Sequence, residues 1–487
     1  MKNINVGTYL DKLKMIAGAG NKNKNYDLSL QAISASAQIL HLYNQVYKDD
    51  ELENMLFQIS SKLVDYPEWD RENKSRKIIL FYDGFGVDRR GIAIVMNNAI
   101  GLNEYKLIYI SPLNTKGNQP TLEKTLAPFD VEWEYLDTDC SYTESVEQLT
   151  KILYKYQPDF SYFYTTPNDV VGVVVFDALK GKTFRCQLDL TDHAFWLGLN
   201  AFDLCSGGRQ FSANIQHYFR DIPLEKMSLL DVNLLVDDCE FQGLPFEKNS
   251  RFIFSGGSLY KTLGDENNTF YRIIEHVLDA FPDIKFLYAG QGDDSQMRCL
   301  MNKYPERVFL ISERPDFYQI IERCTLYLNT YPMFGGLMMR YSALAGKLPL
   351  TLKHGNDSDG ILIDQNQRNI EYESFDELVQ DIDKLLSDED YLHSREKLLD
   401  GSVLTEECFV RNIRMMIEEH KTEFSYGDVV PVDTTQFRKE YLERFRYSDI
   451  AKAIASKRNT SLIKYFPGAF GYVLFIKIRK KIRSVIK

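Results

Sequence analysis

Short apolar runs recur along much of the chain, and most are followed by a turn and then by a segment with helical spacing. Runs of four to eight apolar residues bounded by turn residues are typical of strands buried on both faces. Strands that alternate with helices predict a parallel sheet covered by helices on both sides. The pattern restarts at residue 251 and therefore predicts an α/β protein with two doubly wound domains.

The first copy of the pattern covers residues 76–236 and predicts an N-terminal α/β domain. Its first strand runs into a glycine-rich loop. The predicted strands are residues 77–82, 105–110, 131–135, 160–164, 171–176, 184–190, 202–205 and 227–236, and the predicted helices are 92–100, 142–156 and 212–219.

The second copy covers residues 251–421, after a predicted linker at 237–250 that contains Gly243 and Pro245. Ser374 and Glu377 have the spacing of a capping box before a helix. The predicted strands are residues 251–254, 286–289, 308–311, 326–328 and 349–352, and the predicted helices are 269–281, 316–323, 337–345, 375–386, 391–399 and 405–420.

Two outer segments complete the chain. Residues 1–75 carry two apolar stripes at helical spacing and predict a helical extension for packing or oligomerisation. Residues 422–487 are polar and aromatic, with helix expected from residue 435 and a basic amphipathic tail. In that tail, residues 465–476 are uncharged and mostly apolar, so they favour either a packed helix or one in the membrane interface.

Composition and charge narrow the class of protein. The 487 residues are 44% hydrophobic, and the seven cysteines are scattered without a C-x-x-C pair, which argues against a zinc site or disulfide framework. No apolar signal core or window of about 18 apolar residues is present, so we expect a cytoplasmic protein. Residues 452–487 hold ten Lys/Arg and no Asp/Glu, which leaves the rest acidic, at −21. An acidic body disfavours nucleic acid, and a basic tail suits an anionic membrane face.

Four successive strand ends of the second domain carry glycine, serine or proline. They are residues 255–258, 290–292, 312–315 and 329–336, and Lys261 adds a cation after the first. Such turns offer backbone N–H groups to an anion, and parallel sheets bind ligands at this edge. The mixture favours a diphosphate and a sugar over a metal cluster.

In the first domain, Gly84, Gly86 and Gly91 lie in a loop with Arg90 between the first strand and helix. The spacing is not G-x-G-x-x-G, so a dinucleotide fingerprint is absent, and either a binding loop or a simple tight turn fits.

Asp192 and His193 follow a buried strand directly, which places them at the ligand edge of the first sheet. A histidine there can donate a hydrogen bond or exchange a proton. Because the two residues are adjacent, we expect their side chains to point in different directions. Asp137-Thr138-Asp139 matches D-x-D but is interpreted as a loop, so no metal and no cofactor are expected.

Three segments of the second half occur in the order found in a known family. They are residues 255–261 (SGGSLYK), 288–292 (YAGQG) and 331–349, which ends in ALAGKLP. They resemble the donor-binding domain of nucleotide-sugar glycosyltransferases with two Rossmann-like domains, the GT-B type, group 1/family 4-like. The first half fits through residues 84–91 and 192–193, so the resemblance covers about residues 76–420. It implies two Rossmann-like domains facing a cleft.

Three positions depart from the family pattern. Many retaining members have two glutamates where this chain has Phe334 and Ser342, and an arginine where it has Gly256. Of the two cations that usually hold the diphosphate, only the lysine has a match, Lys261. Arg340 and Lys353 are candidates for the second cation.

The resemblance implies a metal-independent, hexosyltransferase-like enzyme on the cytoplasmic face of the membrane, acting in cell-surface polysaccharide or glycoconjugate synthesis. It would move a sugar from a nucleotide-diphosphate sugar to a glycan, lipid-linked glycan or protein. His193 and Lys261 would be catalytic. The expected donor-binding residues are Gly256, Gly257, Ser258, Gln291, Gly292, Arg314, Pro315, Phe334, Gly335, Gly336, Leu337 and Ser342, and the expected acceptor-side residues are Gly84, Gly86, Arg90, Gly91 and Asp192.

Two alternatives stay open at this point. A catalytically degenerate GT-B subunit would bind glycans or stabilise a partner transferase, as the missing glutamates allow. An epimerase or phosphorylase on the same scaffold is the other alternative.

Overall fold

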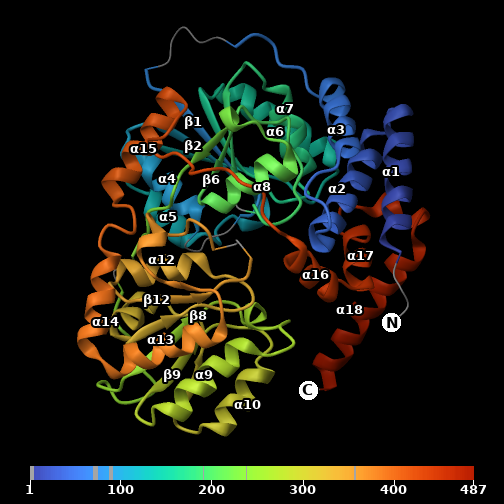
Figure 1. The fold of residues 1–487 in the computed structure, drawn as a ribbon. Coiled ribbons are helices and arrows are strands. Elements are labelled where there is room, and N and C mark those ends of the chain that lie inside the picture. Colours follow the sequence, from blue (N-terminus) through green and yellow to red (C-terminus); the bar gives the residue numbers. More distant parts are fainter. Residues whose placement is uncertain are drawn as a thin grey trace.

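The computed structural model describes residues 5–69, 75–86, 91–189, 191–236, 239–355 and 358–486. Figure 1 shows two α/β units, one above the other, with the N-terminal helices (blue) and C-terminal helices (red) packed together beside the upper one and the last helix running downward to the C-terminus. Arg90 and the linker residues Asp237 and Asp238 lie outside the described residues.

The first sheet has seven parallel strands in the order β3-β2-β1-β4-β5-β6-β7. Its order therefore reverses between β1 and β4, and Ile79 pairs with both Leu107 of β2 and Phe160 of β4. The strands are β1 (Ile78–Asp83), β2 (Lys106–Pro112), β3 (Val131–Leu136), β4 (Phe160–Tyr164), β5 (Phe184–Asp189), β6 (Leu204–Gly207) and β7 (Met227–Leu229).

The second sheet has six parallel strands in the order β10-β9-β8-β11-β12-β13. It reverses between its first and fourth strands, as the first sheet does. The strands are β8 (Phe252–Gly256), β9 (Lys285–Ala289), β10 (Val308–Ile311), β11 (Leu326–Leu328), β12 (Pro349–Leu352) and β13 (Glu371–Tyr372). The two doubly wound domains expected from the sequence are confirmed.

Helices cover both faces of each sheet. Those of the extension and first domain are α1 (Val6–Lys22), α2 (Tyr26–Tyr43), α3 (Asp50–Leu63), α4 (Ile92–Leu102), α5 (Pro120–Leu126), α6 (Tyr142–Tyr156), α7 (Val170–Ala178) and α8 (Gln210–Arg220). Those that follow are α9 (Thr269–Ala280), α10 (Ser295–Lys303), α11 (Phe317–Arg323), α12 (Gly336–Leu344), α13 (Phe375–Ser387), α14 (Glu389–Glu396), α15 (Glu406–Glu419), α16 (Thr435–Arg444), α17 (Tyr447–Ile454) and α18 (Pro467–Ile486). Short 3₁₀ helices include η3 (Leu259–Thr262) and η6 (Thr460–Lys464).

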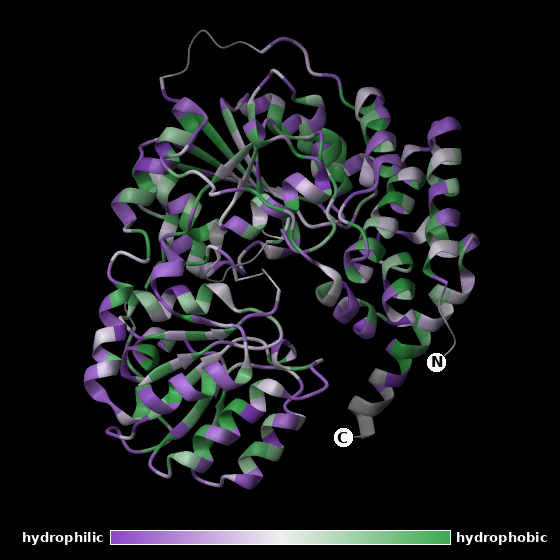
Figure 2. Cartoon of the chain, in the orientation of Figure 1, coloured by the Kyte–Doolittle hydropathy of each residue, from purple (hydrophilic) through white to green (hydrophobic). Residues whose placement is uncertain are grey.

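The cores explain this arrangement. Figure 2 shows apolar residues gathered on the strands and polar residues on the outer helices. One core joins the helical extension, α6, α7 and the C-terminal helices on one face of the first sheet. Another joins α4, α5 and α15 on the opposite face, and a third fills the second domain. The extension therefore packs onto the first domain, together with the end of the chain.

The chain returns to the first domain before residue 421, where the sequence had placed the second domain's end. Helix α15 packs against α4, and its Phe409 and Ile413 are buried in the core of the first domain. The apolar stripe of α15 predicted a helix without showing which sheet it would cover.

Two predicted strands are wrong. Residues 171–176 belong to helix α7, whose N-cap Asp169 accepts a hydrogen bond from the N–H of Gly172 at 2.9 Å. The run of valines is buried almost all round, so it lacks the periodicity that separates a buried helix from a strand. Of residues 227–236, only Met227–Leu229 forms a strand.

Candidate active site

The predicted glycine turns of the second domain meet where its sheet reverses, between β8 and β11. Ligands of doubly wound sheets bind beyond the carboxyl ends of the strands at this point. Gly256 and Gly257 end β8, and Gly335 and Gly336 lie between β11 and α12. The fold thus brings both predicted glycine pairs to neighbouring strand ends of one sheet edge.

The turn after β8 packs directly on the turn after β9. The N–H of Gly257 donates to the carbonyl of Ala289 at 2.9 Å, and the N–H of Leu259 donates to that of Gln291 at 2.9 Å. A Cβ on Gly290 would lie only 1.9 Å from the carbonyl oxygen of Gly257, so this position requires glycine. Gly257 has φ +134°, which also favours glycine. Ser258, Gln291 and Gly292 follow in the same two turns.

Lys261 lies beside the start of α12. Its Nζ donates to the carbonyl of Phe334 at 3.2 Å, and the N–H of Met333 donates to the carbonyl of Lys261 at 3.1 Å. These contacts place the Lys261 ammonium, which follows β8, beside the turn after β11, 73 residues away in the sequence.

Helix α12 begins at Gly336 without a side-chain cap on its N-cap residue, Gly335. The N–H of Gly335 is held by Asn329 Oδ1 at 3.2 Å, and Leu337 in the first turn is exposed. The start of a helix carries partial positive charge from its amides. Together with Lys261, it forms a subsite suited to an anion.

Arg314 and Ser342, both expected to bind the donor, have structural partners. Arg314 donates to both oxygens of Asp316 and to the carbonyl of Gly243, so it ties the linker to the strand end. Ser342 is fully buried and donates to the carbonyl of Lys347 at 2.7 Å. Pro315 is exposed beside Arg314.

Asp192 and His193 follow β5 and are held with Arg209. His193 Nδ1 lies 3.3 Å from Asp192 Oδ1, so the expectation that the two side chains diverge is wrong. The chain turns back here, because the N–H of Ala194 donates to the carbonyl of Thr191 at 3.0 Å. Arg209 Nε donates to the other oxygen of Asp192 at 2.7 Å.

The charge of this group is set by Arg209. Burial raises the pKa of Asp192, but the charge and hydrogen bonds of Arg209 and the contact with His193 lower it more. The pKa of Asp192 therefore lies well below its usual range, and the carboxylate stays ionised. It accepts a further hydrogen bond from Ser212 Oγ at 3.0 Å, which fixes it to α8. His193 is left about one-third exposed, with one side held by Asp192.

Helix α16 bridges the two domains at this site. The ring of Phe437 meets that of His193 edge-on, with 6.0 Å between the centroids. Two further residues of α16 contact the second domain. Glu440 Oε1 lies 2.5 Å from Nε2 of His354, which follows β12, and Arg444 contacts Met333 Sδ. The segment that the sequence described only as polar and helical therefore supplies the buried Glu440 and the partly exposed Arg444 to contacts with the second domain.

The predicted acceptor-side glycines lie at the end of β1. The N–H of Gly84 donates to the carbonyl of Tyr164 at 2.9 Å, which joins the ends of β1 and β4. Asp83 Oδ1 accepts the N–H groups of Phe85 and Gly86, and Gly86 has φ +61°. Gly91 is the N-cap of α4. This group lies on the same sheet edge as His193, but β1 is two strand positions from β5, which precedes His193.

Neither cation proposed to replace the missing arginine is available in that role. Arg340 is buried and forms an ion pair with Asp231 of the first domain, and it also donates to the carbonyls of Gly208 and Ile361 at 2.8 Å each. Lys353 pairs with Glu373 at 2.7 Å. Arg340 instead joins the two domains.

Several residues of the site were missed by sequence reasoning. Arg209, His354 and Glu440 come from three separate segments, and no local motif links them. Within the described residues, no group of three or more His, Cys, Asp or Glu side chains could hold a metal ion. Asp137-Thr138-Asp139 is a loop after β3, as expected, and Asp139 pairs with Lys457.

No protein-family model and no curated protein matches this sequence. Solved structures do match its fold. A glycosyltransferase from Rickettsia africae has 12% identity and a TM-score of 0.53, over 71% of this chain and 99% of its own. An S. aureus TarM mutant in complex with fondaparinux, α-GlcNAc-glycerol and UDP has 9% identity and a TM-score of 0.51, over 71% and 100%.

A Listeria monocytogenes protein assigned as a UDP-N-acetylglucosamine 2-epimerase has 12% identity and a TM-score of 0.50, over 73% of this chain and 100% of its own. These identities are low, and they establish the fold. The two Rossmann-like domains of this chain form a GT-B fold, as the resemblance implied. Glycosyltransferases and an epimerase share it.

Proposed function

We propose that this protein is a glycosyltransferase that moves a sugar from a nucleotide-diphosphate sugar to a glycan, lipid-linked glycan or protein, in the synthesis of a cell-surface polysaccharide or glycoconjugate. The observation that carries the proposal is the contact of Lys261, which follows Gly257 by four residues, with the carbonyl of Phe334 beside Gly335, at the switch point of the second sheet. The TarM structure, which has this fold, contains UDP.

The chemistry follows from the leaving group. When the sugar leaves, negative charge builds on the diphosphate, and preorganised donors lower that barrier. Lys261 and the first amides of α12 supply positive charge beside the turn after β8. A Cβ on Gly290 would meet the carbonyl oxygen of Gly257, so the turn after β9 can pack on the turn after β8 only through backbone at this point.

His193 would face the donor sugar from the first domain. Because Nδ1 of the ring contacts Asp192, which is itself held by Arg209, Nε2 would be the atom that meets a substrate hydroxyl. Asp192 orients and electrostatically supports the imidazole. The reacting acceptor would enter from the first sheet, past Gly84.

Turnover of nucleotide sugars by the Lys261→Ala variant tests this proposal. Purified protein is incubated with UDP, GDP and dTDP sugars, and nucleotide release is measured. Loss of one preorganised charge of this kind lowers turnover by roughly 10²–10³-fold. Lys353→Ala is the matched control, since it removes a cation from a neighbouring strand end that already pairs with Glu373. Equal turnover of Lys261→Ala and wild type would refute the diphosphate assignment.

An epimerase is the second candidate, because the Listeria protein with that assignment shares the fold. Product analysis separates the two. A transferase releases nucleoside diphosphate and elongates an acceptor, whereas an inverted sugar that is still attached to its nucleotide identifies an epimerase.

We also infer that α18 rests in the interface of an anionic membrane. The helix has five Lys/Arg and no Asp/Glu, and its Leu474, Phe475 and Ile478 are 60%, 61% and 50% exposed. No described helix is both long and apolar enough to cross a bilayer. An exposed apolar face with flanking cations suits the interface.

Vesicle sedimentation tests the tail. Deleting residues 465–487 would also remove the buried Phe466 and Ala469, so substitution is the sharper change. Serine at Leu474, Phe475 and Ile478 should abolish binding to vesicles that contain phosphatidylglycerol, and wild type should not bind neutral vesicles. Serine at the exposed Met15 and Phe57 is the control. Unchanged binding of the tail variant would show that α18 is not the anchor.

A further inference from the structure

A cavity of about 360 Å³ lies at the carboxyl ends of β1, β2, β3 and β4 in the first domain. It is therefore at the point where the first sheet reverses its strand order, the position at which doubly wound sheets bind ligands. The proposed chemistry uses the equivalent point of the second sheet and leaves the contents of this cavity unassigned.

Three distant parts of the chain build this cavity. Ser34 comes from α2 of the extension, Asp169 from the start of α7, and Arg458 from the segment between α17 and η6. Tyr142 of α6 donates to Ser34 Oγ at 3.1 Å, and Asn168 Nδ2 donates to the same atom at 3.0 Å. The walls are thus joined by hydrogen bonds across the three parts, and the cavity is preformed.

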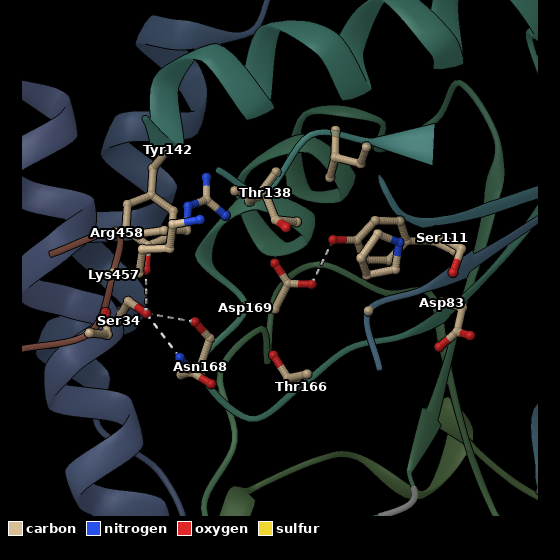
Figure 3. Close-up of a pocket in the computed structure, with 16 residues that line it drawn as sticks. Ser34, Asp83, Ser111, Thr138, Tyr142, Thr166, Asn168, Asp169, Lys457 and Arg458 are labelled. Atoms are coloured by element: carbon tan, nitrogen blue, oxygen red, sulfur yellow. Dashed lines mark hydrogen bonds between the residues drawn. The ribbon is translucent and has the colours of Figure 1, made fainter. Parts of the chain in front are cut away.

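A carboxylate and a guanidinium face the same space. Asp169 accepts from Tyr82 OH at 2.8 Å and from the N–H of Gly172, and Arg458 donates to Ser145 Oγ at 2.7 Å with its guanidinium over the ring of Tyr142. Figure 3 shows Asp169 and Arg458 directed toward one another across the pocket, with no hydrogen bond drawn between them. Burial raises the pKa of Asp169, and the charge of Arg458 opposes that rise.

The lining favours a ligand that both donates and accepts hydrogen bonds. The other polar lining residues are the neutral Ser111, Thr138, Thr166, Ser456 and Asn168 and the charged Asp83 and Lys457. The carboxylates of Asp169 and Asp83 balance the cations of Arg458 and Lys457, so the cavity has no excess positive charge to favour a phosphate. An apolar ligand would remove these charged groups from water without pairing them. A sugar ring meets both demands, because each of its hydroxyls can donate to Asp169 and accept from Arg458.

The size and position of the pocket indicate which part of a saccharide it would hold. The volume is at the small end of the range for ligand sites, about 300–1,000 Å³, and suits one or two rings. The wall of the pocket at the end of β1, with Asp83 and Gly84, is two strand positions from β5, which precedes His193. With strands about 4.8 Å apart, that separation is about 10 Å along the sheet edge. A ring in this pocket is therefore a different ring from the one that reacts near His193.

We propose that the pocket binds a sugar unit of the acceptor remote from the reacting hydroxyl, so that the acceptor is an oligosaccharide or polysaccharide chain. The assignment of the saccharide as the acceptor rests on the proposed function, whereas saccharide binding in the pocket does not depend on it. The helical extension and the C-terminal segment then have a shared role, since each forms one wall of the site.

The test removes the charge of Asp169 and, separately, fills the space. Asp169→Asn keeps a helix N-cap, because asparagine caps as well as aspartate. Thr166→Phe places a ring in the pocket from a side chain that Figure 3 shows lining it. Asp388→Asn is the matched control, since Asp388 is the N-cap of α14 and accepts from Tyr391 at 2.9 Å. Circular dichroism confirms that each variant folds.

Binding is measured on an array of oligosaccharides of varied composition and length and then by titration with the best-bound glycan. Wild type and Asp388→Asn should bind a glycan of two or more units, and Asp169→Asn and Thr166→Phe should weaken binding tenfold or more. Equal binding by folded Asp169→Asn and Thr166→Phe would overturn the proposal, as would an array on which wild type retains no glycan.

Nucleotide-sugar binding, followed by thermal shift, is scored separately. If no nucleotide sugar stabilises the protein but the glycan is bound and lost in the variants, the transferase proposal fails and the saccharide pocket stands. If nucleotide sugars bind and the variants bind the glycan normally, the pocket proposal fails alone.

Discussion

Replacing Arg340 by methionine is the most direct test of how the two domains are held together. Arg340 in α12 forms an ion pair with Asp231 and donates to the carbonyls of Gly208 and Ile361. Its side chain is 6% exposed, and that of Asp231 is 10% exposed. Methionine fills similar space, so the variant mainly removes charge and hydrogen bonds.

The expected cost follows from what remains behind. Removing one partner of a buried ion pair typically destabilises a protein by about 3–5 kcal/mol, because the other charge is left buried and uncompensated. We therefore expect the free energy of unfolding of Arg340→Met to fall by about 3–5 kcal/mol. Lys353→Met removes an ion pair whose partner Glu373 is 72% exposed, and such pairs contribute about 0–1 kcal/mol.

Urea unfolding provides the measurement. Tryptophan fluorescence follows the first domain, which holds Trp133 and Trp196, and far-UV circular dichroism follows both domains. The double variant Arg340→Met/Asp231→Leu removes the orphaned carboxylate and should recover part of the loss. A change below about 1 kcal/mol in Arg340→Met, the size of a surface pair, would refute the reasoning.

The pH dependence of the same variant has a defined sign. Burial raises the pKa of Asp231, and Arg340 opposes this shift, so its removal raises the folded-state pKa further above the unfolded value. A raised pKa gives stability that is present at low pH and lost as pH rises through the folded pKa. The gap between wild type and Arg340→Met should therefore widen from pH 5 to pH 8.

Further expectations concern Glu53, Gly290 and Glu440. Burial raises the pKa of Glu53 to about 7. As pH rises from the unfolded value of 4.5 to 7, the free energy of unfolding of wild type should therefore fall relative to that of Glu53→Gln. Urea unfolding measures the difference, with Glu51→Gln as control, and a difference that stays constant with pH would contradict this. Gly290→Ala should lose nucleotide-induced thermal stabilisation, because its Cβ would lie 1.9 Å from the Gly257 carbonyl, whereas Gly18→Ala, with open space at its Cβ, should keep it. Glu440→Ala leaves His354 without its carboxylate and should lower the thermal unfolding temperature by several degrees; an unchanged temperature would show that α16 does not fasten the domains.

The sheets could be predicted because their strands are buried on both faces and punctuated by turns. β8 and β9 end in glycines that the local pattern shows. α7 could not be distinguished from a strand, because a helix that is apolar all round has no helical stripe. The position of α15 depended on which sheet its stripe covers, and that is a tertiary property.

For the site, the sequence pointed to residues that act through their own backbone turn. Gly256, Gly257, Gly335 and Gly336 lie at neighbouring strand ends of the second sheet, and Lys261 contacts the carbonyl of Phe334 there, while their role in donor binding stays a prediction. Arg209, Glu440 and Arg458 could not be found, since each acts on a residue from another segment. Arg340 looked available as a cation because its partner Asp231 lies 109 positions earlier in the sequence.

The return of the chain to the first domain sets an order for folding during synthesis. Both cores of that domain include residues from beyond position 404, whereas the core of the second domain draws on residues 234–403. A nascent chain that has emerged only to residue 236 lacks α15 over α4 and α17 over α2. Those apolar faces stay open until translation is nearly complete, and such surfaces bind chaperones or aggregate. The second domain can close first, as a contiguous unit, so the half of the molecule made first is the half finished last.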